Sequence, residues 1–120
     1  MKQFVECVPN FSEGRDLVKI KQITDAIEAV DGITLLDSDP GKDTNRTVVT
    51  FVGSVASVEE AAFQGIAKAA EVIDMGSHSG AHARLGATDV CPFIPVSGVT
   101  VKDCVDLSHR VAKRVGDELK

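Results

Sequence analysis

The sequence has no tryptophan or tyrosine, and its only aromatic residues are five phenylalanines among 120 positions. A hydrophobic core must therefore be built largely from aliphatic side chains. An excess of positive charge is also lacking, because 13 basic residues face 18 acidic ones and the net charge is -5. Such a chain repels a phosphate backbone, and we expect no nucleic-acid partner. With 43% apolar residues, residues 1–120 are sized for one domain with one core.

Cysteine is scarce and shows no pairing pattern. Cys7, Cys91 and Cys104 are an odd number and widely spaced, with no Cys-x-x-Cys motif. Neither a disulfide framework nor a zinc site is indicated, and a reducing, cytoplasmic location is expected. No run of about 18 apolar residues occurs, and the N-terminus lacks the pattern of a signal peptide, so we expect no membrane partner.

The hydrophobic pattern predicts strands and helices in alternation. Helical spacing indicates a first helix from about Asp16, a second helix started by a Ser57–Glu60 capping box and a last helix capped by Thr100. Strands are expected over 4–8, 34–37, 46–52 and 90–96, the middle two forming a hairpin with a long tip over 39–43. Pro92 and Pro95 each remove a backbone donor, which favours an edge or a bend in the last strand.

This order resembles a split βαβ unit. We therefore expect an α+β fold, with a mixed β-sheet and helices packed on one face. The opposite sheet face would be uncovered and partly apolar, so something else should cover it.

Titratable residues concentrate in a glycine-rich segment over 74–87. His78 and His82 are four residues apart, but the glycines disfavour a helix and no third ligand is near, so no metal site is expected. An imidazole at this position suits general acid-base chemistry. The alternative is that either histidine only forms hydrogen bonds within a loop.

Two arginines are candidate anion clamps. The guanidinium groups of Arg46 and Arg84 can each grip a carboxylate, although a surface ion pair is the commoner role of an arginine. Cys91 lies in an apolar run without a basic neighbour, which favours an inert buried thiol over a nucleophile. Four aspartates could orient an imidazole or hold an ammonium group, although most lie in turn sequence: Asp37, Asp39, Asp43 and Asp89.

Several segments together carry a family resemblance. They are Val5 to Gly14 (VECVPNFSEG), Leu35 to Asp37, Asn45 to Val48, Phe51 to Gly53, Ile73 to Met75, and the loop that ends in Asp89 to Val96 (DVCPFIPV). The chain resembles the N-terminal subdomain of the glutamate formiminotransferase family, the transferase half of formiminotransferase-cyclodeaminase. The resemblance implies transfer of a formimino group from N-formimino-L-glutamate to tetrahydrofolate, a co-substrate, during histidine degradation.

The resemblance also implies roles for particular residues. The family's catalytic histidine aligns with His82, which would remove a proton from the attacking folate nitrogen and return one to the departing glutamate nitrogen. The two carboxylates of the substrate require cations, for which Arg46, Arg84 and Lys42 are the local candidates. With Asp39, these three make up the expected substrate-binding set.

The sequence departs from the family pattern in the loop. Ala83 stands where a proline usually follows the catalytic histidine, and Ser79 and Ala81 stand at commonly charged positions. Without the proline the loop is less rigid, and His82 is less well pre-organised.

The resemblance implies a second subdomain beyond Lys120, which carries the main folate-binding segment. Two classes of function stay open. One is an enzyme part that acts with a second subdomain on another chain, and the other is a non-catalytic binding module. A formyl donor, N-formylglutamate, is a further alternative. The isolated chain is expected to be a homodimer with little activity.

Overall fold

The computed structural model describes residues 2–73 and 87–119. The elements in chain order are β1 (Phe4–Cys7), β2 (Asn10–Phe11), α1 (Leu17–Glu28), β3 (Thr34–Gly41), β4 (Arg46–Gly53), α2 (Val55–Val72), β5 (Thr88–Val90), β6 (Phe93–Ser97) and α3 (Val101–Glu118). The order of strands and helices agrees with the split βαβ expectation, and the expected α+β class is confirmed. No helix in these described ranges is both long and apolar enough to cross a membrane.

The sheet is built around β4. It pairs with β3 on one side and with β1 and β2 on the other, while β6 and β5 pair with β1 and β2 at the far edge. Every one of these pairs is antiparallel. The expectation of a mixed sheet is therefore wrong for the described residues. The reason is topological: β1 and β3 run in the same direction, but β4 lies between them.

Prolines lie at two breaks between consecutive strands. Pro9 separates β1 from β2, and Pro92 lies between β5 and β6, where the sequence had suggested one strand. The backbone still bridges both gaps, because Val49 N donates to Pro9 O at 3.0 Å and Val8 N donates to Pro92 O at 3.2 Å. The edge position expected from the prolines is confirmed, because β5 and β6 each pair with one strand only. The strand expected over 90–96 is divided into two at Cys91 and Pro92.

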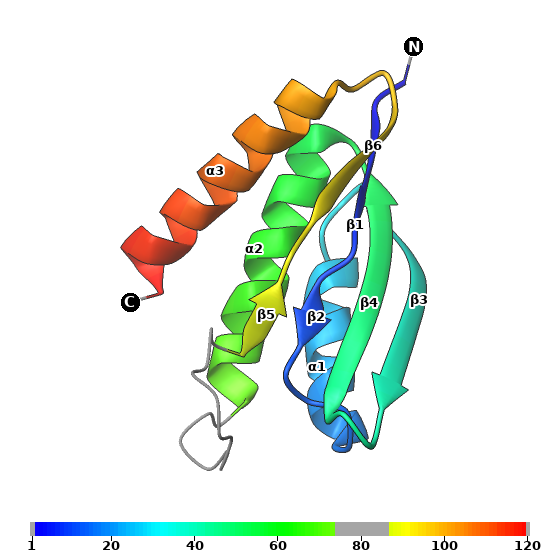
Figure 1. Ribbon diagram of the computed structural model, residues 1–120, viewed down its shortest axis with the longest axis vertical. Coiled ribbons are helices and arrows are strands. Elements are labelled where there is room, and N and C mark those ends of the chain that lie inside the picture. Colours follow the sequence, from blue (N-terminus) through cyan, green and yellow to red (C-terminus); the bar gives the residue numbers. More distant parts are fainter. Residues whose placement is uncertain (1, 74–86, 120) are drawn as a thin grey trace.

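All three helices lie on one side of the sheet, as Figure 1 shows. Alternate strand residues face these helices, and Phe11 and Phe51 are the largest fully buried side chains. The rest of the core is aliphatic or small, as the composition predicts: Val5, Val49, Ile23, Ile27, Val58, Ala61, Leu107 and Val111 are among its members.

The helix starts show where sequence rules hold. Thr100 and Asp103 form a reciprocal capping box at α3, as predicted. The predicted box at Ser57 is wrong, because α2 begins at Val55 and its cap is Ser54, whose side chain accepts a hydrogen bond from Ser57 N. Glu60 therefore lies within the helix rather than in its first turn, and it is free to contact α3.

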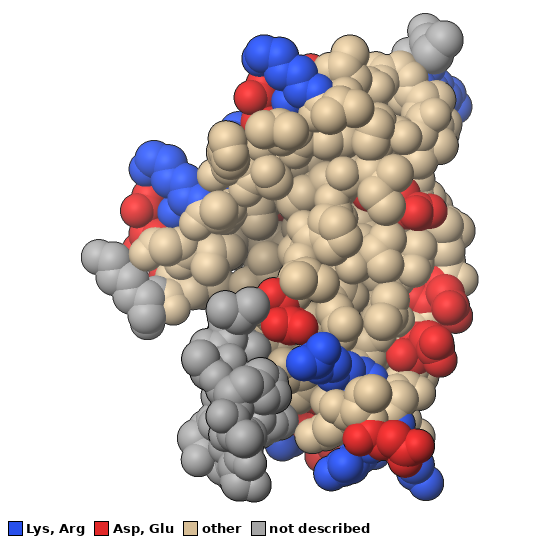
Figure 2. Space-filling view, viewed as in Figure 1, with Lys and Arg blue, Asp and Glu red and all other residues tan. Residues whose placement is uncertain are grey.

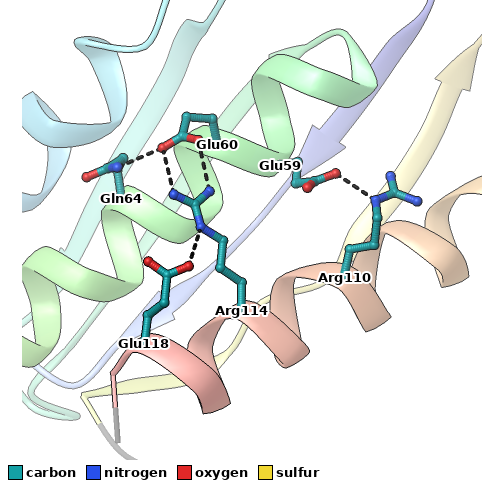
Figure 3. A network of polar contacts seen from close by, with 6 residues as sticks. All are labelled: Glu59, Glu60, Gln64, Arg110, Arg114 and Glu118. Carbon is teal, nitrogen blue, oxygen red and sulfur yellow. Dashed lines mark hydrogen bonds and ion pairs between the residues drawn. The ribbon is translucent and has the colours of Figure 1, made fainter.

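An arginine on α3 joins that helix to α2 (Figure 3). Arg114 Nη1 lies 2.8 Å from Glu60 Oε1, and its Nε lies 3.1 Å from Glu118 Oε2. The same guanidinium sits 3.7 Å from the centre of the Phe63 ring, a cation–π contact. One side chain thus gathers two carboxylates and an aromatic ring between the helices.

Two more contacts extend this network. Arg110, one turn before Arg114 on α3, has its Nε 2.8 Å from Oε1 of Glu59, the residue next to Glu60. Gln64 donates to Glu60 at 2.7 Å. The residues of α3 that are buried are few: Cys104, Leu107 and Val111. The ion pairs therefore add to a narrow apolar contact in holding α3 on α2.

The network predicts an acid-sensitive contribution to stability. Hydrogen bonds from Arg114, and then from Gln64, lower the pKa of Glu60 in the folded chain. A lowered pKa gives stability that is present above the unfolded pKa and is lost as the pH falls through the folded value. Replacing Glu60→Gln should thus reduce the loss of unfolding free energy on acidification from about pH 7 to below about pH 4, by at most about 1 kcal/mol.

Urea denaturation at both pH values measures this effect. Glu71→Gln is the matched control, since Glu71 is an exposed helical glutamate whose partner, Lys68, is on its own helix. An equal acid loss in wild type and Glu60→Gln would contradict the prediction.

Candidate functional site on the open face of the sheet

The sheet face opposite the helices is uncovered. On β4 the buried residues alternate with Arg46, Val48, Thr50 and Val52, which point to this open face. Figure 2 views the open face, which is largely uncharged in its middle and has acidic side chains along the β3 side. Its exposed apolar residues include Phe4, Val48, Val90, Ile94 and Val96. The expectation of a partly apolar, uncovered face is confirmed.

One row of residues crosses this face from β3 through β4 and β2 to β5. Strand register pairs Asp39 with Val48, Val48 with Asn10, and Asn10 with Val90. Asn10 Oδ1 is buried and has no hydrogen-bond partner among the described residues. Buried polar atoms are nearly always paired, so this row places an unpaired amide oxygen between two valines.

Arg46 stands at the polar end of the same face. It begins β4, and its Nη1 lies 3.3 Å from Asp89 Oδ2 on β5. The two side chains are 40% and 24% exposed, so the guanidinium keeps surface available for a further anion. Asp39 is the diagonal neighbour of Arg46 across β3 and β4, within reach of a long side chain. The register thus places Arg46 and Asp39 on the same face as diagonal neighbours.

The turn before Arg46 is held by the segment that precedes α1. Gly14 N donates to Asn45 Oδ1 at 2.9 Å, and Asn45 has a positive φ of 54°. A Cβ on Gly14 would lie 2.3 Å from Gly41 O and 2.5 Å from Arg46 N. The Thr47 hydroxyl also donates to the carbonyl of Glu13. Only glycine allows this close approach, which fixes the start of β4.

Lys42 lies at the tip of the β3–β4 hairpin. Because β3 continues to Gly41, the connection is the short segment 42–45 and not the long tip expected over 39–43. Asp39 is consequently a strand residue. Lys42 is exposed, and its carbonyl accepts a hydrogen bond from Arg15 Nε at 2.9 Å. It lies beyond the last pair, Gly41 with Arg46.

His82 and Arg84, the two other expected site residues, lie outside the described residues, as does His78. The described chain resumes at Ala87, whose carbonyl accepts a hydrogen bond from Ser12 N at 2.8 Å, and β5 follows directly. Within the described ranges, no group of three or more His, Cys, Asp or Glu residues could hold a metal ion.

Sequence reasoning missed Asn10, which it treated only as the end of a strand. The available signal was its place immediately before Phe11, a large apolar residue that the structure buries. In a strand, the neighbour of a buried residue faces the opposite side. The polar side chain of Asn10 therefore belongs to the open face of the sheet, opposite Phe11.

Comparison with known proteins identifies relatives. Residues 4–120 match the family described as the formiminotransferase domain, N-terminal subdomain. The chain is 52% identical over 119 residues to the formimidoyltransferase-cyclodeaminase of Dictyostelium discoideum, which covers 99% of this chain and 22% of that protein.

Two relatives named glutamate formimidoyltransferase are similar over a larger share of their length. The glutamate formimidoyltransferase of Streptococcus pyogenes serotype M1 is 46% identical over 119 residues, or 99% of this chain and 40% of that protein. The enzyme of the same name from Thermoplasma acidophilum is 50% identical over 115 residues, or 96% of this chain and 38% of that protein. The chain therefore spans two fifths or less of these relatives.

The close approach at Gly14 predicts a large effect of one methyl group. Gly14→Ala should lower the unfolding free energy by about 1–3 kcal/mol, because the added carbon meets backbone atoms that cannot move independently. Gly116→Ala is the control: nothing lies within 4 Å of its added carbon, and alanine in a helix is favoured by up to about 1 kcal/mol. Chemical denaturation measures both, and a neutral Gly14→Ala would contradict the packing described here.

Proposed function

Because the chain belongs to the formiminotransferase N-terminal subdomain family, we propose that it supplies one part of a glutamate formimidoyltransferase. The reaction moves the formimino group of N-formimino-L-glutamate to tetrahydrofolate. The observation that carries this proposal is the family match over residues 4–120, in a chain whose open face places Arg46 diagonally from Asp39. The chemistry needs a cation for the donor's carboxylates at such a face.

His82 is the proposed general base and acid. The folate nitrogen attacks the formimino carbon and loses a proton, and collapse of the resulting tetrahedral intermediate expels the glutamate nitrogen, which needs a proton. One imidazole can accept the first proton and donate the second near neutral pH. His82 precedes Ala87 by five residues, and Ala87 O accepts a hydrogen bond from Ser12 N, which directly follows β2.

Arg46 is proposed to bind a carboxylate of the donor, with Arg84 and Lys42 as further cations. Asp89 supports this role because it orients the Arg46 guanidinium without covering it. Asp39 suits the nitrogen of the formimino group, which is positively charged when protonated. Asn10 lies diagonally from Arg46 across β2 and β4.

The open face is also the proposed contact with a second subdomain, on the same or another polypeptide. A face with exposed valine, isoleucine and phenylalanine side chains is costly to leave in water. In the absence of that subdomain, the same face would serve a homodimer. We therefore expect the chain alone to carry some of the residues that bind the donor but not the complete binding site for tetrahydrofolate.

A chimera tests the proposal directly. The matching segment of the Streptococcus pyogenes relative, 46% identical, is replaced by this chain, and transfer from N-formimino-L-glutamate to tetrahydrofolate is measured. We expect turnover by the chimera and almost none by the isolated chain, since catalysis requires both reactants to be held together. Transfer only from N-formylglutamate would favour the formyl donor, and no transfer by a folded chimera that binds the donor would favour the non-catalytic module.

Within the chimera, His82→Ala should lower the rate by about 10²- to 10⁴-fold, as is typical when a general base is lost. His78→Ala is the matched control in the same segment, and we expect a much smaller loss. Equal losses in the two variants, or a larger loss for His78→Ala, would contradict the assignment of His82.

Substitution of Arg46 tests the proposed carboxylate site. Arg46→Gln should raise the KM for N-formimino-L-glutamate about 10- to 100-fold, the equivalent of one charged hydrogen-bonded contact. Arg110→Gln on α3 is the control, because Arg110 also forms a part-exposed ion pair but lies on the helical side. Steady-state kinetics of the chimera measure both, and an unchanged KM for Arg46→Gln would remove Arg46 from the site.

A further inference from the structure

Two thiols that are far apart in the sequence meet beside β1. Cys7 Sγ lies 3.5 Å from Cys91 Sγ, although 84 positions separate the residues. Cys7 ends β1 and has no exposed surface, whereas Cys91 lies between β5 and β6 and is half-buried. Both are free cysteines. The contact is therefore between one core thiol and one that is closer to solvent.

The backbone around the pair holds the two chain segments that carry the cysteines side by side. Cys7 pairs with Phe93 in the β1–β6 ladder, and Val8 N donates to Pro92 O at 3.2 Å. A disulfide requires a sulfur–sulfur distance of about 2.05 Å, so the sulfurs must approach by about 1.5 Å. Cys91 belongs to neither β5 nor β6, so no ladder pair of its own opposes this small approach.

We propose that Cys7 and Cys91 form a reversible oxidation site, at which a peroxide converts the two thiols into an intramolecular disulfide. The Cys91 sulfur attacks one peroxide oxygen, the O–O bond breaks and water leaves, which gives a sulfenic acid. The Cys7 sulfur then displaces the hydroxyl group as a second water and forms the S–S bond. Two thiols are oxidised, one peroxide is reduced to two waters, and a dithiol reductant reverses the change.

Access sets the order of the two steps. Cys91 lines a cavity of about 370 Å³ that also contacts Thr88 and Asp89, and another of about 300 Å³ beside α3. Cys7 reaches neither cavity. Burial and the neighbouring Cys91 thiol raise the pKa of Cys7, which keeps it protonated and makes it a poor first nucleophile. Peroxide therefore meets Cys91 first, and Cys7 completes the bond.

The bond would connect β1 to the chain just beyond β5. Cys91 is two residues from Asp89, the carboxylate that pairs with Arg46. Oxidation thus constrains the strand that carries this carboxylate. Cys104, the third thiol, is 5% exposed and lines the smaller cavity with Cys91, but it has no sulfur contact among the described residues, and we expect it to stay reduced.

The test treats the folded chain with hydrogen peroxide and then alkylates the denatured protein before intact-mass and peptide analysis. We expect a Cys7–Cys91 disulfide, with one alkylated thiol in place of the three of the reduced chain. Dithiothreitol should restore all three. Three thiols after peroxide treatment, a disulfide that includes Cys104, or a bond between two chains would overturn the proposal.

Variants separate the two steps. Cys91→Ala should leave Cys7 reduced, whereas Cys7→Ala should leave a sulfenic acid at Cys91 that dimedone traps. Cys104→Ala is the control and should still form the disulfide. If Cys7→Ala does not fold, Cys91→Ala and Cys104→Ala decide the outcome, because oxidation of Cys7 in the absence of Cys91 would contradict the order proposed here.

Discussion

The register of β4 is the constraint on which both the core and the candidate site depend. This strand pairs with β3 on one side and with β1 and β2 on the other. Its alternation sends Val49 and Phe51 into the core and turns Arg46 and Val48 to the open face. A slip of one residue would exchange the two faces. The burial of the aliphatic core therefore also determines which side of the sheet presents the arginine, and the contacts of Gly14 with the preceding turn fix where the strand begins.

Sequence rules succeeded where the determining contacts are local. The start of α3 follows from Thr100 and Asp103, which interact three residues apart, and the alternating pattern of β4 identifies its buried face. The rules failed where two local solutions compete. Both Ser54 and Ser57 can cap a helix, and Ser54 wins because β4 ends at Gly53, immediately before it. The length of β3 was also underestimated, since Asp39 and Pro40 have turn-forming sequence but are paired with β4.

The candidate site likewise contains residues that the sequence could identify and contacts that it could not. Arg46 and Arg84 could both be singled out from charge alone, whereas the family resemblance was needed to give His82 the catalytic role. The pairing of Arg46 with Asp89 and the unmatched Asn10 could not be foreseen, because both depend on the register of strands far apart in the sequence. Cys91 illustrates the same limit. Its apolar neighbours indicated an inert thiol, but its contact with Cys7 appears only when β1 and β6 are placed side by side.

The two faces of the sheet differ in how completely their side chains are packed and paired. On the helical side the core is closed, and ion pairs around Arg114 add to a narrow contact between α2 and α3. On the open side Val90, Ile94 and Val96 remain exposed, and Asn10 Oδ1 lacks a partner among the described residues. Exposed apolar area and unpaired polar atoms both raise the free energy of the chain in isolation. A partner that covers this face would recover the part of that free energy that comes from the exposed apolar area. It would also exclude water from Arg46, which strengthens the attraction of Arg46 for a carboxylate. Assembly and substrate binding would then be coupled, because both act on the same face.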